Sequence, residues 1–277
     1  MKFNLLFVLT LIDIGTQAAP LPALQNGALL PGIIIIDDME RHRKNPATIS
    51  NKIPVQAVKQ TNDPDVLIID NMNSFQPQQC IKEAPLFLKN PSDGEQEGPE
   101  QTNSLGGREG PYRQAPSWAE SVKSEGYGKI GSGLKIVYDK KNRGGPHNDG
   151  GFCGYYTVLH GFVGEYLDAS RYQYLTFWVK GAKGNEKFKV GAADKTWAQA
   201  DDSLKSKEVG SYLPAGKITT DWQQAVIPLS EFSIDWKLAH AISFCFEADL
   251  FPNGAGQGTI FIDELVFMKN KPAQTPE

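Results

Sequence analysis

From residue 117 onward, apolar and polar residues alternate in short runs that are separated by Gly, Pro, Asn or Asp. Positions 134, 136 and 138 carry Leu, Ile and Tyr, and positions 175, 177 and 179 carry Leu, Phe and Val. Because side chains of a strand point alternately to its two faces, this period of two predicts half-buried strands. The expected strands lie near 66–70, 117–125, 133–139, 152–160, 173–181, 187–193, 207–213, 222–229, 242–248 and 258–268.

No period of 3.6 residues persists long enough to predict a major helix. Nine or ten short strands at this spacing are typical of a β-sandwich or barrel. Inward-facing residues are spread evenly over the expected strands, which favours two packed sheets. The pattern therefore predicts an all-β fold for residues 66–270, with a short tail at 271–277.

The first 18 residues have the features of a secretory signal peptide. Lys2 is followed by a mostly apolar stretch, and Thr16-Gln17-Ala18 offers a small-x-small cleavage site. The apolar stretch is interrupted by Asp13 and is shorter than the roughly 20 residues that a membrane span needs. We expect cleavage after Ala18 and a secreted or periplasmic protein without a membrane span.

Residues 19–65 contain six prolines and a single apolar run, Ile33–Ile36, so we expect a poorly ordered N-terminal segment. Residues 76–116 have the composition of a loop or insertion. The string at 35–40 (Ile-Ile-Asp-Asp-Met-Glu) resembles that at 68–73 (Ile-Ile-Asp-Asn-Met-Asn), and either could be the first strand. We favour the second because it is closer to the other expected strands.

Net charge and cysteine spacing argue against two kinds of site. The 277-residue chain has a net charge of −4, so it lacks the excess of positive charge that is typical of proteins that bind nucleic acid. The three cysteines, Cys80, Cys153 and Cys245, lack the spacing of a zinc site, and we interpret them as unpaired thiols.

Six short strings, taken in order, resemble carbohydrate-binding modules with a galactose-binding-like jelly-roll fold, especially the family 11-type modules. The resemblance covers about residues 66–268 and implies a jelly-roll β-sandwich of two antiparallel sheets. It also implies an exported, non-catalytic protein that binds a polysaccharide or oligosaccharide, and we expect a monomer. The strings are 69–73 (Ile-Asp-Asn-Met-Asn), 103–107 (Asn-Ser-Leu-Gly-Gly), 150–157 (Gly-Gly-Phe-Cys-Gly-Tyr-Tyr-Thr), 175–181 (Leu-Thr-Phe-Trp-Val-Lys-Gly), 220–230 with Phe232, and 260–265 (Ile-Phe-Ile-Asp-Glu-Leu).

A sugar has apolar C–H faces edged by hydroxyls, so its binding site needs aromatic rings and polar groups. The resemblance implies this role for Phe152, for the Asp235–Trp236 pair, and for Trp197 with Asp201 or Asp202 in the loop after the fifth expected strand. Tyr156 lies on the same face as Phe152 by the period of two. Packing in the core is the alternative for all of these aromatic residues, but we favour exposed loop positions among charged residues for Trp197 and Trp236.

The resemblance also implies a structural calcium site. First and last strands are neighbours in this fold, so Asp70 or Asn73 would meet Asp263, with Glu40 replacing Asn73 if the earlier string is the first strand. Calcium prefers six to eight oxygen ligands, which carboxylates supply.

Two other functions remain open. The same sandwich could be a protein-binding assembly or surface module. A polysaccharide-degrading enzyme would need two carboxyl groups roughly 5–10 Å apart. Glu247, Asp249, Asp194 and Glu208 are available, but the sequence does not pair them, and it contains no recognisable nucleophile motif. We therefore assign no catalytic residues.

Overall fold

The computed structural model describes residues 63–72, 95–97, 101–160 and 165–273. All of them belong to one compact unit, Pro54–Glu277. The predicted signal peptide, residues 19–62 and Cys80 lie outside the described residues. Within the described part of the chain, no helix is long and apolar enough to cross a membrane.

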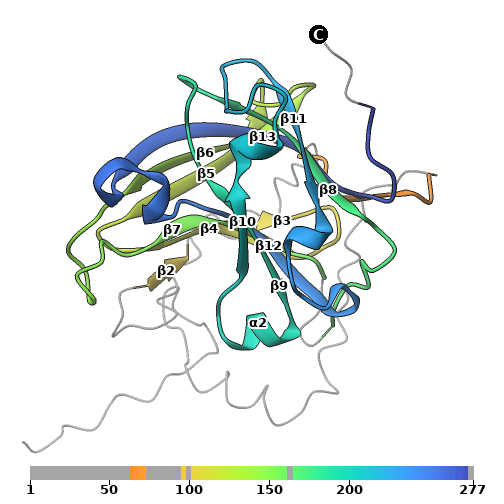
Figure 1. Ribbon diagram of the computed structural model, residues 1–277, viewed down its shortest axis with the longest axis horizontal. Coiled ribbons are helices and arrows are strands. Elements are labelled where there is room, and N and C mark those ends of the chain that lie inside the picture. The colour runs from red at the N-terminus through yellow and green to blue at the C-terminus, as the bar shows by residue number, and fades with distance from the viewer. Residues whose placement is uncertain (1–62, 73–94, 98–100, 161–164, 274–277) are drawn as a thin grey trace, which may run out of the picture. The chain divides into compact units, whose positions relative to one another are not determined.

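Strands are the main regular structure of the described residues (Figure 1). One five-residue α-helix, α2 (Lys195–Gln199), and several single 3₁₀ turns connect them. The strands are β1 (Val66–Asp70), β2 (Glu95–Glu97), β3 (Gln101–Thr102), β4 (Arg108–Gln114), β5 (Trp118–Glu125), β6 (Ser132–Lys140), β7 (Cys153–Val158), β8 (Tyr174–Gly181), β9 (Lys189–Asp194), β10 (Leu204–Glu208), β11 (Gln223–Pro228), β12 (Ala239–Cys245) and β13 (Gly256–Met268). The 3₁₀ turns are η2 (Val209–Tyr212), η3 (Leu229–Glu231), η4 (Trp236–Leu238), η5 (Ala248–Leu250) and η6 (Pro252–Gly254).

The strands form two antiparallel sheets that lie as two layers in Figure 1. Sheet A has the order β11-β8-β13-β6-β5, with β1 paired to β13. Sheet B has the order β10-β9-β12-β7-β4-β2, with β3 paired to β4. The predicted all-β sandwich is confirmed, and so is the expected pairing of the first and last strands, in which Asp70 opposes Leu265.

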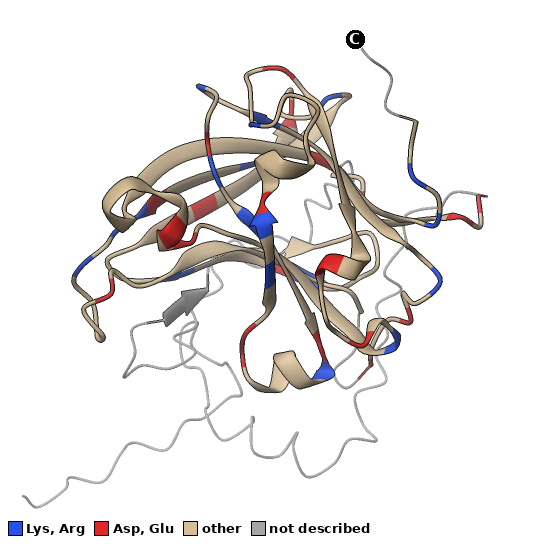
Figure 2. Ribbon diagram, viewed as in Figure 1, with Lys and Arg blue, Asp and Glu red and all other residues tan. Residues whose placement is uncertain are grey.

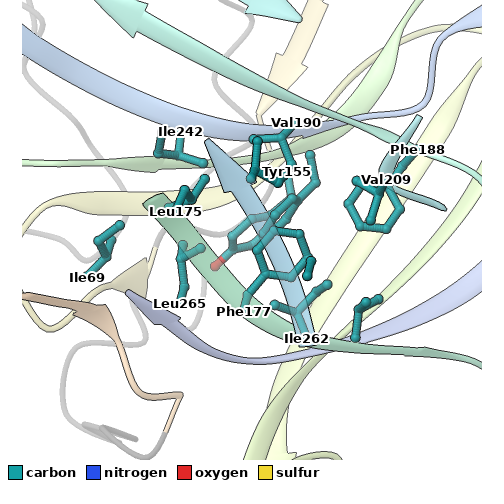
Figure 3. Close-up of a cluster of buried hydrophobic side chains, with 14 of the residues drawn as sticks. Ile69, Tyr155, Leu175, Phe177, Phe188, Val190, Val209, Ile242, Ile262 and Leu265 are labelled. Carbon is teal, nitrogen blue, oxygen red and sulfur yellow. The ribbon is translucent and has the colours of Figure 1, made fainter. Parts of the chain in front are cut away.

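The core lies between the sheets and is rich in aromatic rings (Figure 3). Phe188 packs edge-on against Phe244 at a ring-centroid distance of 5.5 Å, and Phe177 packs against the same ring at 5.4 Å. The alternating residues of 134–138, 175–179 and 188–192 are all at most 2% exposed, as the period of two predicts. Burial of these side chains stabilises the fold by about 25 cal/mol per Å² of apolar surface.

Two strand predictions were wrong. Residues 108–114 were assigned to a loop but form β4, whose Gly-Pro dipeptide resembles turn chemistry. On one edge of β4, β2 pairs with residues 112–114 and β3 pairs with residues 108 and 109. Pro111 lies between these two pairings, so neither β2 nor β3 requires the N–H group that proline lacks.

The strand expected at 207–213 instead covers 204–208. Its sequence, Leu-Lys-Ser-Lys-Glu, lacks an apolar alternation because β10 is an edge strand that pairs only with β9 among the described strands. The apolar signal came from Val209, which is fully buried but belongs to the following turn, η2.

A buried ion cluster links the two sheets. Nζ of Lys123, on β5 of sheet A, contacts a carboxylate oxygen of Asp70 on β1 and one of Glu109 on β4 of sheet B. All three side chains are at most 2% exposed. The network continues through Thr157, whose Oγ1 donates to Glu109 Oε2 at 3.3 Å, and through Asn103, whose Nδ2 donates to Thr157 Oγ1 at 2.6 Å. A buried charge is tolerated only when it is paired and hydrogen-bonded, as each is here.

One ammonium group faces two carboxylates, so the cluster would carry a net negative charge if both were ionised. Burial first, and then the nearby charge of Asp70, raise the pKa of Glu109 to about 8. The pKa of Lys123 is also raised, because the two carboxylates outweigh the effect of burial. A proton held on Glu109 therefore keeps the buried cluster neutral.

This proton predicts a pH-dependent stability. The folded-state pKa of about 8 lies above the ordinary value of 4.5, so between about pH 5 and pH 8 the folded protein keeps a proton that the unfolded chain releases. The contribution of Glu109 to the free energy of unfolding is therefore fully present below about pH 4.5 and is lost progressively as the pH rises to about 8. Urea unfolding across this range should show a steeper decline for the wild type than for Glu109→Gln, whose amide does not titrate. Parallel pH profiles of the two proteins would contradict the assignment.

Candidate functional site

A cleft of about 600 Å³ lies over the outer face of sheet B. Tyr156 of β7 opposes Gly110 of β4 on one side and Ser243 of β12 on the other, and Ser243 opposes Gly191 of β9. The residues before and after Ser243, Ile242 and Phe244, are buried in the core. Period-two alternation therefore directs this cross-strand row away from the core and into the cleft.

Small residues form the floor of the cleft. Side chains no larger than Ser occupy positions 193, 241 and 243, all of which line it. A Cβ atom added at Gly191 would collide with the hydroxyls of Ser203 and Ser243, and one at Gly154 would collide with the Tyr112 hydroxyl. The depth of the cleft thus depends on glycine at one position in each of β7 and β9.

Three aromatic side chains, Tyr112, Phe152 and Tyr156, line the cleft. The rings of Tyr112 and Phe152 are 6.0 Å apart and tilted by 48°. Phe152 is 38% exposed, and it follows Gly150 and Gly151, whose positive φ angles let the chain turn into β7. Its ring therefore offers an apolar surface that solvent and a ligand can reach.

Tyr112 is held in place from beneath. Its hydroxyl donates to Sγ of Cys245 at 3.3 Å. Burial raises the pKa of Tyr112 well above its ordinary value of 10, so the phenol stays neutral. Cys153 and Cys245 are both buried free thiols, which confirms the prediction for these two cysteines.

Charged groups from the loop after α2 and from β10 also line the cleft. Asp202 Oδ1 accepts a hydrogen bond from Ser203 N at 2.7 Å and contacts Nζ of Lys205. Burial raises the pKa of Asp202, but the hydrogen bond from Lys205 and the one from Ser203 N outweigh burial and hold it below the ordinary value. The basic positions of β10 are visible in Figure 2. Asp202 is therefore a permanent acceptor beside a permanent donor.

The cleft follows the direction of β12. His240, at the start of this strand, and Glu247, just beyond its end, both line the cleft. From His240 to Cys245 the strand extends by roughly 17 Å at about 3.4 Å per residue. His240 is itself positioned by His160, whose Nε2 lies 2.9 Å from His240 Nδ1. A site of this length suits an extended, chain-like ligand.

Three of the six predicted ligand-binding residues come together in this cleft: Phe152, Tyr156 and Asp202. The other three do not line it. Trp197 is half-buried on α2, although its neighbour Ala198 does line the cleft. Asp235 is exposed and caps η4 by accepting a hydrogen bond from Lys237 N at 3.0 Å.

The expectation of an exposed Trp236 was wrong. Its ring packs edge-on against Phe232 at 5.9 Å and Phe267 at 5.7 Å, and its Nε1 donates to Leu229 O at 3.2 Å. The turn η4 folds the ring against the margin of the core immediately before β12 begins. Trp236 thus has the contacts of a packing residue.

Sequence reasoning missed Arg108, Tyr112, Ser243 and Lys205 as lining residues. Ser243 could have been found, because it is the polar member between Ile242 and Phe244 in an apolar run. No signal identified Arg108 and Tyr112, since their strand resembles a loop in sequence.

The expected calcium ligands do not converge. The carboxylate of Asp70 forms an ion pair with the Lys123 ammonium group, whose positive charge would repel a calcium ion. Asn73 and Glu40 lie outside the described residues. Asp263 Oδ2 accepts a hydrogen bond from Lys129 N at 2.8 Å. Over the described ranges, no group of three or more His, Cys, Asp or Glu side chains is suited to hold a metal ion.

The described residues around Asp70 and Asp263 therefore do not fit a calcium cage. Calcium binding by the protein stays a prediction.

Comparison with known proteins gives a consistent assignment. The family model of carbohydrate binding domain 30 matches residues 117–269, more than half of the chain. No curated protein matches the chain.

Several solved structures are similar. A family 30 carbohydrate-binding module is 18% identical, with a TM-score of 0.44, and the match covers 57% of this chain and 77% of the module. The family 11 module of a cellulosomal cellulase of Clostridium thermocellum is 15% identical, with a TM-score of 0.41 and coverages of 58% and 86%. A family 11 module from the same organism in complex with a β-1,3-1,4-mixed-linked tetrasaccharide is 15% identical, with a TM-score of 0.43 and coverages of 63% and 95%.

The contacts of Asp263 predict a role as a hydrogen-bond acceptor. Replacement by Ala leaves the backbone N–H groups of Lys129 and Ile130 without this acceptor. Asp263→Ala should lower the free energy of unfolding by about 1–3 kcal/mol. Denaturant unfolding with EDTA and with added calcium should give the same loss. A loss that appears only when calcium is present would instead make Asp263 a metal ligand.

The packing of Trp236 predicts a stability defect. Trp236→Ala should lower the free energy of unfolding by about 2–3 kcal/mol, below the roughly 3–5 kcal/mol of a fully buried ring, because Trp236 is half-buried. Thermal unfolding of the variant provides the measurement. An unchanged melting temperature would restore Trp236 as an exposed binding residue.

Proposed function

Because this chain belongs to the carbohydrate binding domain 30 family, we propose that the cleft on sheet B binds a polysaccharide or oligosaccharide without cleaving it. The observation that carries the proposal is the combination of three aromatic side chains with charged and hydroxyl groups in one extended cleft. Phe152 and Tyr156 offer rings for the C–H faces of sugar units, and Asp202, Lys205 and Ser243 offer partners for sugar hydroxyls.

The cleft is better suited to binding than to hydrolysis. A glycosidase needs one carboxylic acid that carries a proton at working pH and a second carboxylate across the scissile bond. Asp202 is held ionised by Lys205 and Ser203 N, which makes it a poor general acid. Asp201 and Glu247 also line the cleft, and the proposal gives neither of them a catalytic role.

Four further expectations enter this proposal. Export requires removal of residues 1–18, which mass spectrometry of the exported protein would detect as an N-terminus at Ala19. A monomer is expected, and sedimentation measures it. Calcium binding is a further expectation, and added calcium should then raise the melting temperature. The residues around Asp70 and Asp263 do not form a calcium site. The finer resemblance to family 11 modules also stays a prediction, since the family model that matches is that of family 30.

The proposal predicts a loss of glycan affinity for Phe152→Ala. Soluble β-1,3-1,4-mixed-linked glucan is a suitable first ligand, because the structure of one family 11 module contains such a tetrasaccharide. Removing the exposed ring should weaken binding by at least about tenfold, equivalent to about 1.4 kcal/mol. Isothermal titration calorimetry measures the affinity, and a thermal melt should be nearly unchanged because Phe152 is 38% exposed. Tyr156→Ala should have the same effect on affinity.

Trp197→Ala is the matched control, since Trp197 lies on α2 beside the cleft but does not line it. Its affinity should equal that of the wild type. Equal affinity for all three variants would place the binding site elsewhere. Release of new reducing ends from the glucan by the wild type would overturn the non-catalytic part of the proposal.

A further inference from the structure

The outer face of sheet A carries a row of alternating lysine and apolar side chains. Lys135 of β6 opposes Val122 of β5 on one side and Phe261 of β13 on the other, and Phe261 opposes Lys180 of β8. Trp222 directly precedes β11, and the Nζ of Lys180 lies 5.0 Å from its ring centroid. The order across the sheet is thus Val122, Lys135, Phe261, Lys180, Trp222, which we call the aromatic–lysine row.

A second layer of the same kind lies on this row. The β5–β6 turn carries Tyr127, whose ring is 5.7 Å from that of Phe261, and Nζ of Lys135 is 5.4 Å from the Tyr127 ring. The same turn places Nζ of Lys129 3.0 Å from the ring centroid of Trp178. Asp263 holds the turn by accepting hydrogen bonds from the N–H groups of Lys129 and Ile130. The arrangement is therefore fixed by the fold.

The lysines of this face lack carboxylate partners. Among the described residues, seven other lysines form ion pairs with Asp or Glu, but Lys129, Lys135 and Lys180 form none. Their ammonium groups instead lie over aromatic rings. In a chain with a net charge of −4, the row therefore presents lysines on both sides of an aromatic ring.

Acidic groups flank the row but do not lie in it. Asp221 precedes Trp222 and Glu264 follows Asp263, and both are exposed. Asp263 is 1% exposed and is engaged by backbone N–H groups. Glu120 is exposed two positions before Val122, so it lies on the same face of β5 but in the next cross-strand row, opposite Val137.

We propose that the aromatic–lysine row is a second binding site, and that its ligand is an acidic polysaccharide. Sugar carboxylate or sulfate groups would pair with Lys135 and Lys180, and the apolar face of a sugar ring would lie against the half-buried Tyr127–Phe261 ring pair between them. The outer face of sheet A lies on the opposite side of the core from the sheet B cleft. The proposal goes beyond the neutral-glycan function of that cleft and does not depend on it.

The spacing of the row favours this class of ligand. Lys135 and Lys180 are separated by one strand, so their backbones lie about 9.5 Å apart with an aromatic side chain between them. A ligand must therefore present charge, apolar surface and charge in sequence. Single-stranded nucleic acid also combines charge and flat rings, but its binding depends on many phosphate contacts. Three lysines offer few such contacts, so single-stranded DNA serves as the competing ligand in the test.

The experiment compares the full chain with a Lys135→Gln/Lys180→Gln variant, in which two charges are lost and shorter, neutral polar side chains remain. The ligand is polygalacturonate, and its methyl ester provides the same backbone without the charges. Calorimetry should show binding of polygalacturonate by the wild type, none of the ester, and an affinity at least about tenfold weaker for the variant. Raising the ionic strength from about 0.1 M to about 1 M, which shortens the Debye length from about 10 Å to about 3 Å, should abolish wild-type binding.

The matched control is Lys195→Gln/Lys237→Gln, which removes two exposed lysines of α2 and η4, outside sheet A, and changes the net charge equally. It should bind polygalacturonate as the wild type does. The row variant should keep its melting temperature and any affinity for neutral mixed-linked glucan, which separates this proposal from the function of the cleft. Absent polygalacturonate binding, equal loss in both double variants, or equally tight and equally charge-dependent binding of single-stranded DNA would each overturn the proposal.

Discussion

One ammonium group, the Nζ of Lys123, holds two carboxyl groups from different sheets in a core that otherwise consists largely of apolar side chains. Asp70 comes from the first described strand and Glu109 from β4, so the contact joins β1 and β5 of sheet A to β4 of sheet B. A buried ion pair contributes little net stability, but loss of one partner leaves an uncompensated charge, which is strongly unfavourable. The cluster therefore restricts how the two sheets can be placed relative to each other.

The consequences of this restriction reach the cleft. Glu109 opposes Thr157 across β4 and β7, and this register places Gly110 opposite Tyr156 and Tyr112 opposite Gly154. A shift of one residue would exchange the buried and exposed faces of β4 and would turn Tyr112 inward. The polar cluster on the inner face of sheet B thus sets which aromatic side chains line its outer face.

The two outer faces use the same residue types for different surfaces. On sheet B, small residues such as Gly191 and Ser243 hollow the face, and the cleft follows β12. On sheet A, Lys and aromatic residues alternate across the strands and give a surface of rings covered by lysine stems. Long lysine side chains can cover apolar rings while their charged ends remain in water. A hollow surface suits a chain that enters it, and a lysine-rich surface suits a ligand with negative charge.

The sequence by itself determined the sandwich, most of its strands and its core. The alternation in 134–138 and 175–179 predicts the buried face correctly, because the period of a strand is a local property of the chain. It also placed Phe152 and Tyr156 on one face. The polar edge strand β10 and the Pro-containing β4 escaped because their side chains carry no apolar period.

Tertiary structure decided everything that depends on which strands are neighbours. Asp70 has the sequence context of a calcium ligand, yet the fold brings Lys123 against it. Trp236 has the sequence context of an exposed loop aromatic, yet η4 folds it against Phe232 and Phe267. The alternation along a strand determines to which face of the sheet a side chain points. The register between strands that are far apart in sequence determines which residues that side chain contacts.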